Sequence, residues 1–113
     1  MKIIKTLFLK GLVLTLVLAR FNVYAADQSI CHSGTNIVFH DNGAIKECQL
    51  KDDYAANNIR CKSDGHVTFY NNGNLESCVL SASITIDKNK CKEDGSISFF
   101  IDGRLKSCMN QDN

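Results

Sequence analysis

Six cysteines are the residues of this chain whose type and spacing can do chemistry. They form three pairs with members 17 positions apart, and the pairs recur every thirty positions. The pairs are Cys31 and Cys48, Cys61 and Cys78, and Cys91 and Cys108. Such thiols can form disulfides or bind a metal ion. Metal binding is disfavoured because no Cys-x-x-Cys or Cys/His pair has the spacing of zinc ligands.

His32, beside Cys31, comes nearest to a metal-ligand pair, but the equivalent positions of the other pairs carry Lys62 and Lys92. A zinc site built from a repeat would recur with the repeat. An even number of cysteines in a short chain that begins with an export signal favours disulfides instead. We therefore expect six disulfide-bonded cysteines and no metal site.

The cysteine spacing leaves more than one pairing scheme open. Pairing within each recurring unit uses every cysteine in the same way. The rival scheme joins Cys48 to Cys61 and Cys78 to Cys91, which leaves Cys31 and Cys108 at opposite ends. In a flat sheet the cysteines of one unit would lie about 10 Å apart, too far for a bond. Within-unit pairing, which we favour, therefore requires the segment after the first cysteine to fold over the sheet.

Catalytic chemistry has little support in the sequence, because a nucleophile, a base and an orienting group must come together. His32, His40 and His66 occupy three different positions of the repeat, so no histidine belongs to the repeated pattern. No phosphate-binding glycine loop is evident either. We expect a protein without enzymatic activity and without a cofactor.

The first 25 residues have the features of a secretion signal. Lys2 and Lys5 precede a short apolar run, 11–19, and Val23-Tyr24-Ala25 supplies small residues at the positions that a signal peptidase reads. The run is shorter than the roughly 20 residues of a membrane-spanning helix, which disfavours an uncleaved anchor. We expect cleavage after Ala25 and a secreted or periplasmic protein with no membrane span.

The charge of the remaining chain, 26–113, excludes one class of partner. The signal holds four of the 13 Lys and Arg and none of the 12 Asp and Glu, so nine basic and 12 acidic residues remain, a formal charge of −3. The basic residues alternate with acidic ones, as in 87–94, whereas a nucleic-acid surface needs clustered cations. We expect no nucleic-acid binding.

The fixed period of the cysteine pairs is typical of stacked repeats. We therefore expect a single domain of three repeated units, 31–60, 61–90 and 91–113, which position the cysteines. Besides its cysteines, each unit carries one Phe and one Gly at fixed places, with an aliphatic residue two positions before the Phe and another two after the Gly. These residues are Ile37, Phe39, Gly43 and Ile45; Val67, Phe69, Gly73 and Leu75; and Ile97, Phe99, Gly103 and Leu105.

The pattern of each unit predicts a β-hairpin. In the first unit, Ile37 and Phe39 alternate with polar residues as in a half-buried strand, and Asn42-Gly43 is a strong turn signal. A three-residue loop, 41–43, places Ile45 opposite Phe39 on the same face, whereas a two-residue loop would turn it to the other face. We therefore expect the three-residue loop, and a core strip formed by the Phe of every unit.

The connecting segments are less alike. Asp64-Gly65 and Asp94-Gly95 predict a second turn before the strand, although the first unit places Gly34 one position early. Ser83–Ile86 predicts an extra strand, and Asp52–Asn58 predicts a loop or helical turn. With no proline and no helical periodicity over three turns, the chain is expected to be an all-β antiparallel meander of hairpin repeats, stabilised by disulfides.

The hairpin motif Phe69-Tyr70-Asn71-Asn72-Gly73-Asn74-Leu75 resembles the variant MORN-type repeats found in many bacterial proteins. The resemblance covers about seven residues in each unit. The chain departs from that family in its longer period, its added cysteines and its lack of a glycine-rich second half. The resemblance implies an elongated β-sheet that contacts proteins or lipids without catalysis.

One row of residues is a candidate binding surface. His40, Tyr70 and Phe100 each follow the core Phe of their unit and should protrude from the opposite face. Exposed aromatic residues in a row are typical of binding sites; alternatively, this face is buried by the linker strand or by a dimer.

We therefore predict a protein-interaction module whose partner is a protein. Two alternatives remain open. One is a structural component of the envelope or extracellular matrix. The other is a disulfide-rich effector or inhibitor acting through a unique loop, 51–58.

Overall fold

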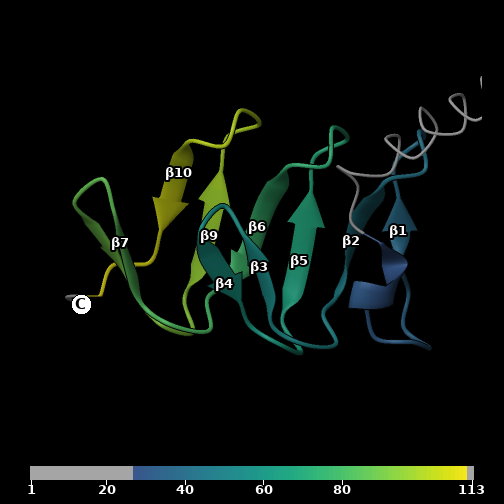
Figure 1. Ribbon diagram of the computed structural model, residues 1–113, viewed down its shortest axis with the longest axis horizontal. Helices are drawn as coiled ribbons and strands as arrows, with labels where there is room; N and C mark the ends of the chain where they lie inside the picture. Colours follow the sequence, from purple (N-terminus) through teal and green to yellow (C-terminus); the bar gives the residue numbers. More distant parts are fainter. Residues whose placement is uncertain (1–26, 112–113) are drawn as a thin grey trace, which may run out of the picture.

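The computed structural model describes residues 27–111, so the predicted secretion signal lies outside the described residues. The fold is all-β, as predicted: an antiparallel sheet with short hairpins on one side (Figure 1). A single turn of 3₁₀ helix, η2 (Gln28–Ile30), precedes the sheet. Within the described part of the chain no helix is long and apolar enough to cross a membrane.

Ten strands follow η2 within residues 27–111. The main sheet has the order β1-β2-β5-β6-β9-β10, while β3 pairs with β4 and β7 with β8. The strands are β1 (Val38–Phe39), β2 (Ile45–Gln49), β3 (Tyr54–Ala56), β4 (Ile59–Cys61), β5 (His66–Phe69), β6 (Leu75–Val79), β7 (Ile84–Ile86), β8 (Asn89–Cys91), β9 (Ser96–Phe99) and β10 (Leu105–Cys108).

The main hairpins have the predicted three-residue loop. Phe39 lies opposite Ile45, and the equivalent pairs recur thirty residues further on in β5–β6 and β9–β10. The His40 amide donates to the Ala44 carbonyl at 2.8 Å, and the Gly43 amide donates to the His40 carbonyl at 2.9 Å. Gly43 has a φ of 91°, the left-handed conformation that this loop requires at its third position.

The second turn explains why glycine comes early in the first unit. Gly34, Asp64 and Asp94 occupy the same turn position and have φ values of 81°, 66° and 65°. Aspartate tolerates this left-handed conformation better than most residues. Gly95, one position later, meets a different constraint, because a Cβ there would lie 3.0 Å from the Cβ of Met109.

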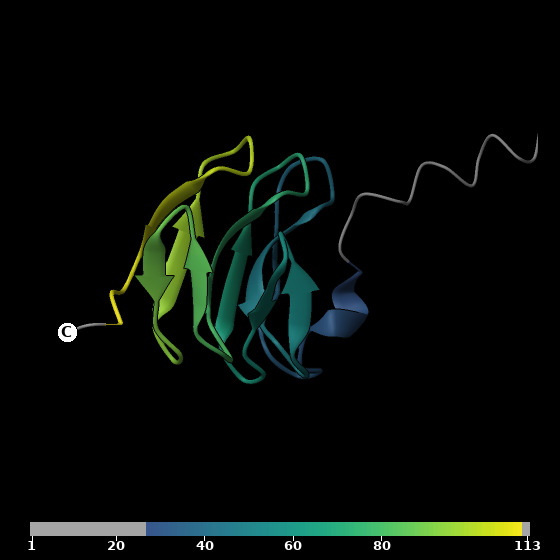
Figure 2. The same ribbon diagram turned by 60° about the vertical axis from the view of Figure 1, so that its left-hand side comes forward.

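The prediction for Asp52–Asn58 was wrong. Its residues Tyr54–Ala56 form strand β3, and Asn57 and Asn58, with φ values of 51° and 65°, make the tight turn into β4. Two left-handed residues in a row are typical of a type I′ hairpin turn. The strand expected at Ser83–Ile86 is present as β7, in the equivalent hairpin. Both hairpins lie over the same face of the main sheet (Figure 2).

The cysteines pair within each unit, as favoured from the sequence. The Cα–Cα distances are 5.9 Å for Cys31–Cys48, 5.7 Å for Cys61–Cys78 and 5.5 Å for Cys91–Cys108. The expected 10 Å separation does not arise because Cys61 and Cys91 end the covering hairpins and lie outside the main sheet. The segment that folds over the sheet is the one before the first cysteine of these units, not the one after it.

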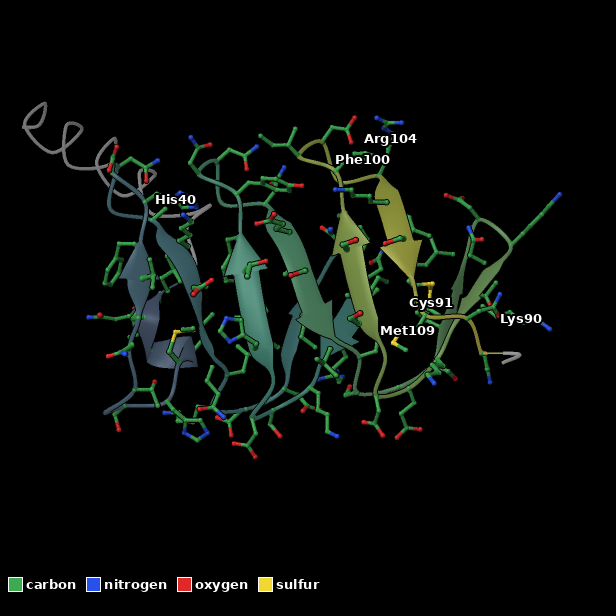
Figure 3. The ribbon with its side chains drawn as sticks, turned by 180° about the vertical axis from the view of Figure 1, so that it is seen from behind. His40, Lys90, Cys91, Phe100, Arg104 and Met109 are labelled. Atoms are coloured by element: carbon green, nitrogen blue, oxygen red, sulfur yellow. A yellow bond between two sulfur atoms is a disulfide. The ribbon has the colours of Figure 1, made fainter. Side chains whose placement is uncertain are left out.

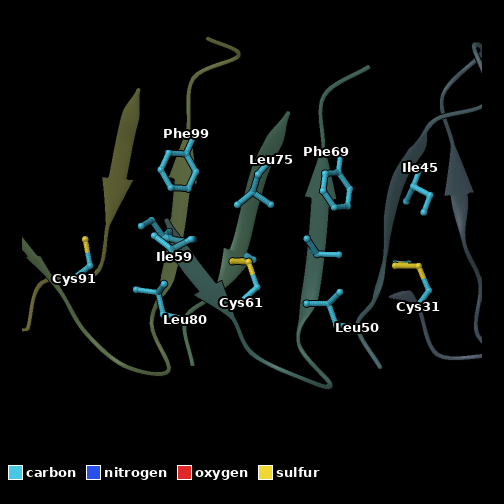
Figure 4. Packing of buried hydrophobic residues seen from close by; sticks show 14 residues of the cluster. Cys31, Ile45, Leu50, Ile59, Cys61, Phe69, Leu75, Leu80, Cys91 and Phe99 are labelled. Carbon is cyan, nitrogen blue, oxygen red and sulfur yellow. A yellow bond between two sulfur atoms is a disulfide. The ribbon is translucent and has the colours of Figure 1, made fainter. Parts of the chain in front are cut away.

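The core lies between the sheet and its covering hairpins (Figure 4). The ring of Tyr54 on β3 contacts that of Phe69 edge to face, with centroids 5.9 Å apart. Phe69 and Phe99 are each 2% exposed, but Phe39 is 47% exposed. The predicted core strip therefore stops at Phe69, because β1 is an edge strand and no hairpin of the described residues precedes it.

Candidate functional site

The structure does not bring His40, Tyr70 and Phe100 together as one exposed row. His40 Nε2 lies 2.8 Å from the carbonyl oxygen of Phe69, and the Tyr70 hydroxyl donates to that of Phe99, also at 2.8 Å. Both side chains are half-buried, because each reaches across to the next unit. Phe100 has no following unit within residues 27–111, and it is 40% exposed.

Exposed apolar and basic residues lie at the carboxyl end of the sheet. We call them the C-terminal end surface: Phe100, Ile101, Arg104, Lys106 and Met109. Phe100 and Arg104 lie at the loop end of β9 and β10, and Met109 lies at the other end of these strands (Figure 3). Ile101 and Met109 are 51% and 48% exposed. The Arg104 guanidinium carbon lies 5.0 Å from the centre of the Phe100 ring, and Lys106 Nζ lies 5.9 Å from it, within range of cation–π attraction.

Arg104 is held in place by its own turn. Its backbone amide donates to Asp102 Oδ1 at 3.0 Å, and its Nε donates to Asp102 Oδ2 at 2.8 Å. These hydrogen bonds, the backbone bond first, lower the pKa of the Asp102 carboxyl group below its ordinary value. The turn thereby fixes a cation beside the exposed Phe100 ring.

Next to this surface the core is open. A hollow of about 250 Å³ lies between the β7–β8 hairpin and β10. Its lining residues are Asp87, Asn89, Lys90, Leu105, Lys106, Ser107, Cys108 and Asn110. Leu105 and Cys108 are only half-buried there, whereas the equivalent Leu75 and Cys78 are each 2% exposed. Among the described residues, no strand pairs with the outer edge of β10.

The face of the sheet opposite the hairpins carries hydroxyl groups. Glu47, Thr68, Ser77, Ser98 and Ser107 lie opposite one another on successive strands. The Thr68 and Ser77 hydroxyl oxygens are 2.6 Å apart, and those of Ser98 and Ser107 are 3.0 Å apart. These hydroxyls pair with one another and make the middle of this face polar, while the exposed Val38, opposite Glu47, lies on the same face.

The remaining histidines lie beside carboxylate groups on the surface. His32 Nε2 lies 2.5 Å from Asp64 Oδ1, and His66 Nε2 lies 3.7 Å from Glu47 Oε1. No group of three or more His, Cys, Asp or Glu within residues 27–111 is placed to hold a metal ion.

Sequence reasoning identified Phe100 but missed Ile101, Lys106 and Met109 of the C-terminal end surface. The available signal was the end of the repeat pattern, since no further unit follows the last one within residues 27–111. No protein-family model, curated protein or solved structure matches this chain. The resemblance to MORN-type repeats stays a prediction.

Proposed function

We propose that this chain is a secreted or periplasmic, non-enzymatic protein-interaction module that binds its partner through the C-terminal end surface and the adjoining edge of β10. The observation that carries the proposal is the combination of an open strand edge, a hollow and exposed apolar side chains at one end of the sheet. An open edge can accept an extended segment of another protein through backbone hydrogen bonds.

The side chains at this end favour a protein partner. Phe100, Ile101 and Met109 supply apolar contact area, and Arg104 and Lys106 form a basic rim beside them. Aromatic residues, Met and Arg are enriched in protein interfaces. The half-buried Leu105 and Cys108 add an apolar floor to the hollow.

The proposed location rests on the cysteine chemistry. The three disulfides are compatible with an oxidising compartment, and among residues 27–111 no cysteine is left free. Together with the predicted secretion signal, this favours the periplasm or the cell exterior.

The test is a capture experiment from an extract of the protein's own compartment. The oxidised protein should retain a stoichiometric partner, and the Phe100→Glu variant should lose it, because a carboxylate would replace the exposed ring between two cations. The matched control is Val38→Glu, which changes an equally exposed apolar residue at the opposite end of the sheet. This control should retain the partner.

Two results would contradict the proposal. Equal capture by both variants of a protein other than this chain would place the contact elsewhere on the molecule. Equal capture by a reduced and alkylated sample would show that the folded sheet edge is not required.

A structural role in the envelope or extracellular matrix is the second candidate function. It is favoured by the two outer strands of the main sheet, β1 and β10, whose outer edges are both unpaired within residues 27–111.

A further inference from the structure

One kind of strand junction occurs twice inside the chain. In the first, between β2 and β5, Glu47 lies opposite Thr68 and Cys48 opposite Val67. In the second, between β6 and β9, the residues thirty positions further on pair in the same register: Ser77 with Ser98 and Cys78 with Ile97. The chain therefore contains two copies of one interface, each joining the second strand of one hairpin to the first strand of the next.

Each end of the main sheet carries one of the two strand edges that form this interface, but there the edge has no partner strand within residues 27–111. Strand β10 is equivalent to β2 and β6, and β1 is equivalent to β5 and β9. Within residues 27–111, neither the outer edge of β10 nor that of β1 is paired with another strand.

The side chains at the two ends are complementary as well. At an internal junction, the Phe of the incoming strand is buried beneath the preceding hairpin, as Phe69 and Phe99 are. At the β1 end the equivalent Phe39 is 47% exposed. At the β10 end the hollow beside Leu105 and Cys108 occupies the place where such a ring would lie.

We propose that the partner of the C-terminal end surface is a second copy of this chain, whose β1 adds to β10 in the register of the internal junctions. This inference rests on the proposed function and names its partner. The register places Val38 of the second copy opposite Ser107 and Ile37 opposite Cys108. Phe39 of the second copy then enters the hollow beneath the β7–β8 hairpin.

The contact joins two different surfaces, so it repeats from copy to copy and gives head-to-tail chains instead of a closed dimer. Two differences make it weaker than the internal junctions. Asn89 stands at the hollow in place of the buried Ile59, and Phe100 replaces Tyr70, whose hydroxyl bonds the next unit. The association is therefore concentration-dependent, in contrast to the permanent junctions inside the chain.

Sedimentation velocity of the oxidised protein, from about 1 μM to about 1 mM, tests the proposal. The mean mass should rise with concentration for the unaltered protein. The Phe39→Lys variant should stay monomeric, because it presents a cation to the hollow. The matched control is Ala55→Lys, which introduces the same cation at an exposed strand position of the β3–β4 hairpin, away from β1 and β10; it should associate like the unaltered protein.

Two further measurements examine the head-to-tail direction of the contact and the affinity of the association. Phe39→Lys keeps an intact β10 end, so adding it in excess should terminate chains of the unaltered protein and lower their mean mass. Asn89→Ile restores the apolar residue of the internal junction and should tighten association by about tenfold or more, given the burial of one aliphatic side chain. This gain does not depend on whether the Phe39 variant folds.

A protein that is monomeric at about 1 mM, both unaltered and as Asn89→Ile, would overturn the self-association proposal. Equal association of the Phe39→Lys variant would overturn it too, since another surface would then be responsible. Neither result would contradict the proposed function if the unaltered protein still captures a different protein and the Phe100→Glu variant does not. The absence of both self-association and capture would contradict both proposals.

Discussion

At the scale of single residues, the turn position of Gly34, Asp64 and Asp94 requires a left-handed backbone. A Cβ at Gly34 would meet nothing within 4 Å, so the only penalty of a substitution there is conformational. Gly34→Asp should therefore change the free energy of unfolding little, while Gly34→Val should lower it by about 1–2 kcal/mol because β-branched residues disfavour positive φ. Urea unfolding of the two variants distinguishes these outcomes; equal losses would contradict the backbone explanation.

Tyr70 forms a polar link between units through its hydroxyl bond to the Phe99 carbonyl. Tyr70→Phe keeps the ring and removes this bond, so it should lower the free energy of unfolding by about 1 kcal/mol. The reciprocal change, Phe100→Tyr, adds a hydroxyl where the chain offers no following unit within residues 27–111. It should leave the stability of the dilute protein unchanged in the same thermal or urea unfolding measurement.

The Asp102 turn predicts a small acid sensitivity. Since the pKa of Asp102 is lowered in the folded protein, its contribution to stability is present above the ordinary carboxyl pKa and is lost as the pH falls through the lowered value. Asp102→Asn should lack this loss in acid. It should also retain the turn, because Asn42 and Asn72 accept the equivalent backbone hydrogen bonds.

Carbon NMR titration of the Asp102 carboxyl group checks the cause of this shift. Arg104→Ala should raise the pKa of Asp102 towards its ordinary value, because it removes the Nε donor. An unchanged pKa in that variant would assign the shift to the backbone amide alone.

At the scale of elements, two of the three disulfides, Cys61–Cys78 and Cys91–Cys108, fasten a covering hairpin to the sheet. All three close loops with the same sequence separation, 17 residues, so their chain-entropy contributions are equal, at about 3 kcal/mol each. Replacing Cys61 and Cys78 by alanine should nevertheless cost more than replacing Cys91 and Cys108, because the central pair holds the β3–β4 hairpin over the main core. Denaturant unfolding of the two double variants measures the difference, and equal losses would mean that the hairpin packs as well without its bond.

The strand register could be predicted because only one loop length puts the apolar residues of both strands on the same face. A three-residue loop, with Gly43 left-handed at its third position, sets Phe39 opposite Ile45, whereas a two-residue loop would turn Ile45 to the other face. The β3–β4 hairpin could not be predicted in the same way. A strand of three residues is too short to display alternation, and Asn57-Asn58 fits a loop as well as a tight turn.

The candidate site was harder to predict than the fold. Phe100 was singled out by its repeat position, but the same reasoning selected His40 and Tyr70, which bond to the next unit. What distinguishes Phe100 is that no unit follows its own within residues 27–111, and a pattern shared by all units cannot report this. The hollow has the same origin, since it lies where a further strand would complete the core.

At the scale of the whole molecule, the two outer strands of the main sheet, β1 and β10, differ in how well they are protected from pairing with other strands. β1 has only two residues, Val38 and Phe39, which limits the length of ladder that it offers. β10 is longer and carries Lys106, a charged residue of the kind that discourages indiscriminate edge pairing. An added strand must therefore match the β10 edge in both register and side chains, which favours a specific partner over general aggregation.

The disulfide pattern has a further consequence for how the protein is made. Each bond joins cysteines that are consecutive along the chain, so no bond encloses another. In the secreted or periplasmic form that we propose, the chain crosses a membrane from its amino terminus, so Cys31 and Cys48 are both available before Cys61 emerges. A thiol oxidase that oxidises the cysteines in the order in which they emerge therefore forms the three native disulfides directly. No disulfide isomerase is then needed to correct wrong pairs.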